Sequence, residues 1–233
     1  TVWPDGVTVH SPSVQLIGIP SCVSREFGHC GNDFAAVRRF PDAVIDAIER
    51  STVAVGDWLR SKGYLGSFGV DFLVTDEDVL FAEVNPRFQG STLTSSRIDA
   101  GLGLPCLMLE HVAAWLGMTR IDGPNLRERV ADAEVVSSVV VHWTGTEPRH
   151  VNASDLVRRV ESDRPSVLAD VVTSPHVIND PGSTVARLTL PGSLTQSGFD
   201  LDAGLVAAID EWRSGQLTQS DPRMDSGAIP TET

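Results

Sequence analysis

The sequence predicts an α+β fold, because strand-like segments follow one another in the chain instead of alternating singly with helices. The runs 68–75 and 79–86 are rich in Val and Phe and are separated only by Asp76, Glu77 and Asp78. Such neighbouring runs are typical of an antiparallel hairpin. A long amphipathic helix precedes them and further strand-like runs follow, with no regular βαβ alternation and no internal repeat. With 233 residues and 41% hydrophobic content, the chain can form one large domain or two small ones.

The elements before the hairpin are a short strand pair, a loop and the long helix. Residues 1–18 contain the turn signal WPDG between extended runs, and residues 22–34 are punctuated by glycine, which predicts a loop. The helix is predicted from Pro41 to Lys62, because proline suits the first helical position and apolar residues then recur at helical spacing. Gly63 suits its C-terminal cap.

The elements after the hairpin are predicted to be two helices, three strands and a polar tail. In chain order they are a helix at 105–116, strands at 135–143, 166–172 and 184–190, a helix at 202–213 and a disordered tail at 214–233. The turn sequence NDPGS joins the last two strands.

Charge and cysteine content exclude several classes of protein. The net charge of −13 argues against a protein that binds nucleic acid or an anionic membrane through broad electrostatic attraction. No stretch approaches the ~20 apolar residues that span a bilayer, and no signal-peptide pattern opens the chain. Three cysteines without a CxxC spacing predict reduced thiols and a cytoplasmic location.

The hairpin has a predicted register that separates its two faces. If the turn consists of residues 76–78, Thr75 lies opposite Val79, and further along Asp71 lies opposite Glu83. A register shifted by one residue would mix apolar and polar side chains on both faces. The predicted apolar face consists of Val70, Phe72, Val74, Leu80, Ala82 and Val84.

The other face carries Asp71 opposite Glu83, with Asn85 and Arg87 next along the second strand. Opposed carboxylates destabilise a sheet unless one is protonated or a cation lies between them. Asn85 adds a third oxygen, and a small set of oxygen ligands suits Mg²⁺, while Arg87 offers a fork of donors for phosphate or carboxylate. The alternative interpretation, a solvated face on which two acids tolerate each other, stays open from the geometry alone.

The segments GSFGVDFLV and VLFAEVNPRFQGST, within residues 66–92, are similar to the C-terminal part of ATP-grasp enzymes. The resemblance implies that Asp71, Glu83 and Asn85 are ligands of Mg²⁺ or Mn²⁺. It also implies that Arg87 contacts a phosphate or acyl phosphate and, together with Gly90 and Ser91 of the turn 90–92, contributes to catalysis.

The implied function is an ADP-forming carboxylate–amine ligase that works through an acyl phosphate, with ATP as co-substrate. Its other partners would be a small-molecule carboxylate and an amine, and a homodimer is one assembly to consider. Within the family the pattern looks closest to peptide ligases. Alternatives are an enzyme of the biotin carboxylase or carbamoyl phosphate synthetase type, or a non-catalytic ATP-grasp-like binding domain.

The chain departs from the family pattern in one respect. ATP-grasp enzymes hold phosphates with lysines of an earlier lobe, whereas the only lysine here is Lys62, and no GxxxxGK[ST] loop replaces it. We therefore expect the chain to be the C-terminal part of a longer protein that supplies this upstream lobe. The expected divisions are an ATP-grasp part at 1–120, a small β-rich α/β lobe at 121–213 and the tail at 214–233.

Other residues with reactive or metal-binding side chains are weaker candidates. Cys22, His29 and Cys30 match no common zinc spacing and lack an evident fourth ligand. Asn32 and Asp33 could equally cap a loop or face an active site. Structural roles are expected for Cys106, His111 and His142, and a surface position for Arg97. The tryptophans are expected to be packing residues, and these are Trp115, Trp143 and Trp212.

Overall fold

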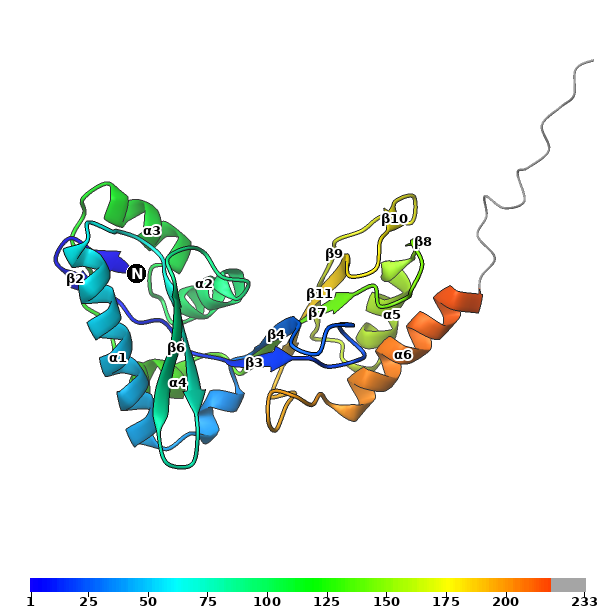
Figure 1. The fold of residues 1–233 in the computed structure, drawn as a ribbon, viewed down its shortest axis with the longest axis horizontal. Helices are drawn as coiled ribbons and strands as arrows, with labels where there is room; N and C mark the ends of the chain where they lie inside the picture. Colours follow the sequence, from blue (N-terminus) through cyan, green and yellow to red (C-terminus); the bar gives the residue numbers. More distant parts are fainter. Residues whose placement is uncertain (219–233) are drawn as a thin grey trace, which may run out of the picture. The chain divides into compact units, whose positions relative to one another are not determined.

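The computed structural model describes residues 1–218, which form two compact units (Figure 1). Unit 1 consists of Thr1–Val14 and Phe34–Val135, and unit 2 consists of Gln15–Asp33 and residues 136–218. The α+β class is confirmed, because both units combine helices with antiparallel strand pairs. Within the described residues, no helix is long and apolar enough to cross a membrane.

The predicted boundary between the two parts of the chain, at residue 120, differs from the boundary in the structure. The prediction also did not include the N-terminal segment that belongs to unit 2. Residues up to 135 stay with unit 1, because α4 (Leu126–Asp132) buries Leu126 in the core of that unit. Residues 15–33 join unit 2, because β4 (His29–Asp33) pairs with β7 (Val136–His142). Each unit is therefore built from segments that are distant in the sequence.

Unit 1 packs its hairpin against helix α1. Its core contains Val37, Ile45, Ile48 and Leu126, with Phe72 and Val79 of the hairpin packed against it. The predicted helix at 41–62 and hairpin are confirmed, and Figure 1 shows α1 beside β6. The elements are β1 (Val2–Trp3), β2 (Gly6–Val7), a 3₁₀ helix η1 (Ala36–Arg39), α1 (Asp42–Ser61), β5 (Gly69–Val74), β6 (Val79–Asn85), α2 (Thr92–Gly101), α3 (Leu107–Trp115) and α4.

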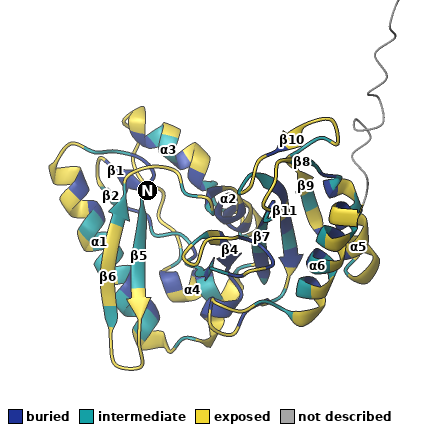
Figure 2. Cartoon of the chain, turned by 45° about the vertical axis from the view of Figure 1, so that its right-hand side comes forward, coloured by how far each residue is buried: buried dark blue, intermediate teal, exposed yellow. Residues whose placement is uncertain are grey.

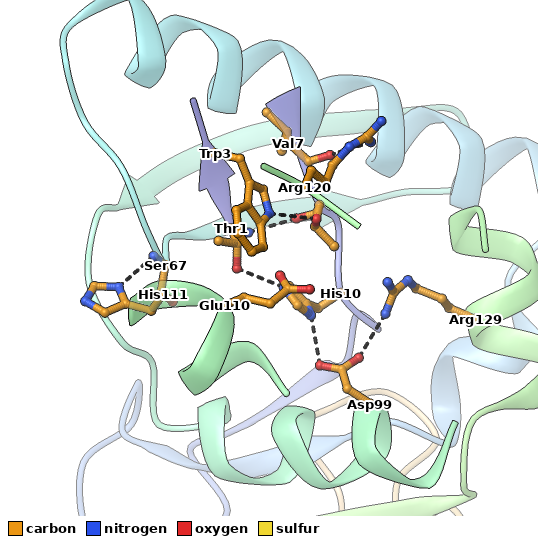
Figure 3. A network of polar contacts seen from close by, with 11 residues as sticks. Thr1, Trp3, Val7, His10, Ser67, Asp99, Glu110, His111, Arg120 and Arg129 are labelled. Carbon is orange, nitrogen blue, oxygen red and sulfur yellow. Dashed lines mark hydrogen bonds and ion pairs between the residues drawn. The ribbon is translucent and has the colours of Figure 1, made fainter. Parts of the chain in front are cut away.

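A cluster of buried ionisable side chains ties the segment after β2 to three helices of unit 1 (Figure 3). Asp99 of α2 is fully buried and lies 2.9 Å from His10 Nδ1 and 2.9 Å from Arg129 Nη1 of α4. The other ring nitrogen of His10 lies 3.2 Å from the buried carboxylate of Glu110 on α3. Because a buried charge needs compensating partners, these contacts fix the position of α2 against its neighbours.

Unit 2 is organised around a five-stranded sheet in the order β3-β4-β7-β11-β9. Figure 2 shows the buried residues that line β7 and β11, the strands in the middle of this order. Trp143 and Trp212 are buried edge-to-face at 6.5 Å, which confirms their predicted packing role. The further elements are β3 (Val14–Ile17), β8 (Arg149–His150), α5 (Ala153–Asp163), β9 (Leu168–Val171), β10 (Ile178–Asn179), β11 (Thr184–Pro191) and α6 (Ala203–Thr218).

Three predictions about local structure are wrong. Residues 29–33 form β4 instead of a loop, because Gly31 lets two backbones approach closely: a Cβ there would lie 2.1 Å from the Ser138 carbonyl oxygen. Helix α6 continues to Thr218, beyond the predicted tail start at 214, and the rest of that tail lies outside the described residues. Trp115 is 59% exposed, so it is not a core residue.

Replacing Asp99 with asparagine is expected to lower the free energy of unfolding of unit 1 by about 3 kcal/mol, because Arg129 would lose its buried counter-charge. Amide resonances of α2 during a urea titration would report this loss. The matched control is Asp122→Asn, whose carboxylate pairs with Arg120 but is 98% exposed, and whose cost should stay within about 0.5 kcal/mol. Equal urea midpoints for the wild type and Asp99→Asn would contradict a stabilising role for the cluster.

Candidate metal and phosphate site on the hairpin

The hairpin pairs Asp71 with Glu83 and Gly69 with Asn85, as the register analysis predicts. Near the turn the predicted register is wrong, because Val74 pairs with Val79 and a β-bulge lies between the Asp71 and Phe72 pairs. The cause is a four-residue turn closed by Thr75. The Thr75 hydroxyl accepts backbone N–H bonds from Glu77 at 3.3 Å and Asp78 at 3.0 Å.

The bulge changes which apolar side chains share a face. Phe81 pairs with Phe72 and joins Val84 on the side toward α1, where both line an apolar hollow of about 380 Å³ beside Trp58. Leu73 and Leu80 pair on the opposite side and are 61% and 48% exposed. The predicted apolar face is thus corrected near the turn, whereas the Asp71–Glu83 pair keeps its expected opposition.

The four residues of the polar row form a connected network. The Asn85 amide donates to Glu83 Oε1 at 2.8 Å and reaches Asp71 Oδ2 at 3.5 Å. Arg87 donates to the Asn85 side-chain oxygen at 3.3 Å and to the Phe88 carbonyl at 3.0 Å. Two carboxylates, an amide and a guanidinium therefore lie next to one another, as the sequence predicts.

The electrostatics of the row favour an ionised Glu83 beside the positively charged Arg87. The hydrogen bond from Asn85 holds the pKa of the Glu83 carboxyl below its usual value. A hydrogen bond with the Asp71 carboxyl and the positive charge of Arg87 lower this pKa further. Glu83 is exposed and Asp71 is half-buried, so both carboxylates can be reached from solvent. An ionised Glu83 beside Asp71 is suited to bind a cation.

The chain turns directly from this row into helix α2. Gly90 and Ser91 form the turn, and Ser91 is the N-cap residue of α2 without a side-chain cap bond. Thr92 is turned inward, because its hydroxyl accepts the backbone N–H of Gln89 at 2.8 Å and the residue is buried. The first N–H groups of α2 thus follow the polar row closely in the chain and carry the partial positive charge of a helix N-terminus.

Among residues 1–218, no group of three or more His, Cys, Asp and Glu side chains is placed to hold a metal ion. The hairpin row has two carboxylates, so its third oxygen would have to come from the Asn85 amide. Oxygen donors in this number suit a magnesium ion that keeps several water ligands and binds phosphate oxygens. Cys22 and Cys30 are buried free thiols, and His29 bonds to Asn32 instead.

The remaining candidates have structural partners or exposed positions. Asp33 is buried and accepts backbone N–H bonds from Leu194 at 2.7 Å and Thr195 at 3.2 Å, so it organises a loop of unit 2. His111 accepts the Ser67 N–H at 3.0 Å, and its ring contacts the Phe88 ring in a tilted arrangement with centroids 4.6 Å apart. His142 is held by the Gly182 carbonyl, Cys106 is the N-cap residue of α3, and Arg97 is exposed on α2.

Sequence reasoning missed Gln89 and the buried cluster around Asp99. One signal was available for the cluster: Glu110 is the only carboxylate in the apolar helix α3, a position that requires a partner when buried. Nothing local indicated that its partner would be His10.

Residues 14–91 match the sequence model of the ATP-grasp domain family. This segment is therefore similar to ATP-grasp domains. The matched ATP-grasp segment ends at Ser91, so it contains the whole row from Asp71 to Arg87. No curated protein matches the chain.

Solved structures with a similar fold include three that cover most of this chain. N5-carboxyaminoimidazole ribonucleotide synthetase from Thermus thermophilus is 16% identical, with a TM-score of 0.39. The match covers 82% of this chain and 41% of that chain. The phosphoribosylaminoimidazole carboxylase ATPase subunit from Aquifex aeolicus is 10% identical, with a TM-score of 0.44 and coverages of 87% and 57%. The N5-carboxyaminoimidazole ribonucleotide synthetase from Thermotoga maritima is 10% identical, with a TM-score of 0.43 and coverages of 83% and 49%. The chain spans about half the length of these structures.

Replacing Asn85 with alanine is expected to raise the pKa of Glu83 toward its ordinary value, because a donor that stabilises the ionised carboxylate is lost. A pH titration of the Glu83 carboxyl carbon by NMR would measure the change. Asn125→Ala, which removes an amide from the N-cap of α4, should leave the Glu83 titration unchanged. An unchanged or lower Glu83 pKa in Asn85→Ala would contradict the proposed hydrogen-bonding role of Asn85.

Proposed function

We propose that the chain is the C-terminal part of an ATP-dependent, ADP-forming carboxylate–amine ligase that works through an acyl phosphate. The observation that carries the proposal is the polar row itself: Asp71 opposite Glu83, bridged by Asn85 to Arg87, on one face of an ATP-grasp hairpin. An opposed carboxylate pair weakens a sheet and is most readily explained by a bound cation.

Asp71, Glu83 and Asn85 would hold Mg²⁺ or Mn²⁺, which would supply charge neutralisation at the phosphates of ATP. The donor types fit such an ion, and the lowered pKa of Glu83 keeps that ligand ionised at neutral pH. The Asn85 oxygen bonds to Arg87 in this structure, so the amide would have to turn toward the carboxylates to serve as a third ligand.

Arg87 would bind the transferred phosphoryl group or the acyl phosphate. Its guanidinium carries five N–H donors. It donates to two neutral oxygen acceptors of its own loop, the Phe88 carbonyl and the Asn85 side chain. The turn at Gly90 and Ser91 and the first N–H groups of α2 would add donors for an anionic oxygen.

The exposure of the row supports a second lobe. An acyl phosphate must be protected from water, and Glu83 and Arg87 are both exposed in this chain. The single lysine, Lys62, lies at the C-cap of α1 and not beside the row, so phosphate-binding lysines would come from the upstream ATP-grasp lobe. Small-molecule carboxylate and amine substrates would enter between the lobes, in the cytoplasm, where the three free cysteines stay reduced.

The turnover test uses the protein that combines this chain with its upstream lobe. With ATP, Mg²⁺ and candidate carboxylates and amines, ADP and phosphate should be released, and Asp71→Asn or Glu83→Gln should slow that release at least about 100-fold. Asp76→Asn, at the exposed hairpin turn, is the matched control and should keep wild-type turnover. Full turnover in Asp71→Asn would remove the basis for the assignment.

The metal site can be tested separately on the 233-residue chain alone. Calorimetric titration with Mn²⁺ should show binding to the wild type and to Asp76→Asn, and much weaker binding to Glu83→Gln, because a ligand charge is lost. Equal Mn²⁺ affinity for all three proteins would place the ion elsewhere.

A further inference from the structure

We propose that Gln89 is a positioning residue that holds Asn85 and Arg87 in place, and that Gly69 is glycine because the Gln89 side chain lies against it. The inference rests on the proposed function in taking Asn85 and Arg87 as site residues. It assigns no chemical step to Gln89.

The side chain of Gln89 bonds to the backbone of both site residues. Its amide nitrogen donates to the Asn85 carbonyl at 3.2 Å and to the Arg87 carbonyl at 2.9 Å. A glutamine amide has two N–H donors, so both are used within this loop. The Gln89 backbone N–H donates to Thr92 Oγ1, which fastens the same residue to the start of α2.

These bonds extend to the carboxylates through Asn85. The Asn85 carbonyl, which Gln89 contacts, also accepts the Arg87 N–H at 2.8 Å. The Asn85 side chain in turn bonds to Glu83. Gln89 is thus linked to Glu83 through one intermediate residue, Asn85. It supports the backbone from which the side chains of Asn85 and Arg87 project. Site geometry depends on such supporting bonds, since displacements near 1 Å can reduce activity about 100-fold.

Gly69 provides the space that this arrangement needs. It pairs with Asn85 across the hairpin, and a Cβ on it would lie 2.7 Å from Gln89 Cγ and Cδ and 2.9 Å from the amide nitrogen. Gly69 does not have the positive φ that would require glycine for backbone reasons. Since the three nearest atoms all belong to the Gln89 side chain, we expect Gly69→Ala to displace that side chain first.

The experiment measures loop order on the full 233-residue chain without metal or nucleotide. Amide hydrogen exchange by NMR should be about tenfold faster at Arg87 and Thr92 in Gln89→Met, which keeps the side-chain length but removes both donors. Gly69→Ala should have a similar effect. Gly101→Ala, a glycine of α2 with open space around its Cβ position, is the matched control and should exchange as the wild type does.

A double-mutant cycle tests the link between the two positions. In a Gln89→Ala background, the side chain that a methyl group at position 69 would displace is absent, so adding Gly69→Ala should cause no further acceleration. Wild-type exchange in Gln89→Met would overturn the role of Gln89, and additive effects of Gly69→Ala and Gln89→Ala would overturn the role of Gly69.

A Mn²⁺ titration of the same variants separates this inference from the proposed function. If the row binds Mn²⁺, Gln89→Met should weaken binding about tenfold although no ligand is changed, as expected for a residue that orients ligands. Unchanged Mn²⁺ affinity in Gln89→Met would overturn the positioning role. If the wild type binds no Mn²⁺, the metal site of the proposed function fails, while the exchange rates still decide whether Gln89 orders the loop.

Discussion

Unit 1 depends on the pairing of one buried carboxylate, Asp99, with Arg129 and His10. The three residues come from α2, α4 and the segment after β2, which have no reason to meet on the basis of their own sequences. Burying a carboxylate costs several kcal/mol unless its partners are well placed, so the unit is held to the arrangement that provides them. Helix α2 starts immediately after the Gly90–Ser91 turn, and the fixed helix therefore fixes one end of the candidate site.

In the candidate site, by contrast, the carboxylates can be reached from solvent and their repulsion is only partly compensated. Asp71 and Glu83 face each other on an exposed hairpin surface, where like charges weaken the strand pair. The Asn85 amide donor and the positive charge of Arg87 offset part of this repulsion without covering the carboxylates. A charge arrangement that lowers sheet stability and remains accessible is typical of a functional site, because packing alone gives no reason to keep it.

The sequence was most informative where structure is local. Alternation along the hairpin was sufficient to pair the two acids of the row, and helical spacing was sufficient to locate α1. The prediction failed where a side chain acts on backbone several residues away, as when the Thr75 hydroxyl lengthened the turn. His10 and Asp99 are far apart in the chain, and neither lies in a motif that names a partner. In the sequence, Gln89 looks like an ordinary polar loop residue. Its two hydrogen bonds to the backbone depend on the fold of the loop, which no sequence pattern indicates.

The β-bulge near Ala82 has a consequence for the pairing of the two acids. In a regular hairpin, adding or removing one turn residue would invert the two faces of a strand and move the carboxylates to the side of α1. Here the bulge absorbs one residue between the turn and the Asp71–Glu83 pair, so the register at the tip differs from the register at the row. The two acids therefore face each other although the turn is one residue longer than a regular pairing of this hairpin would allow.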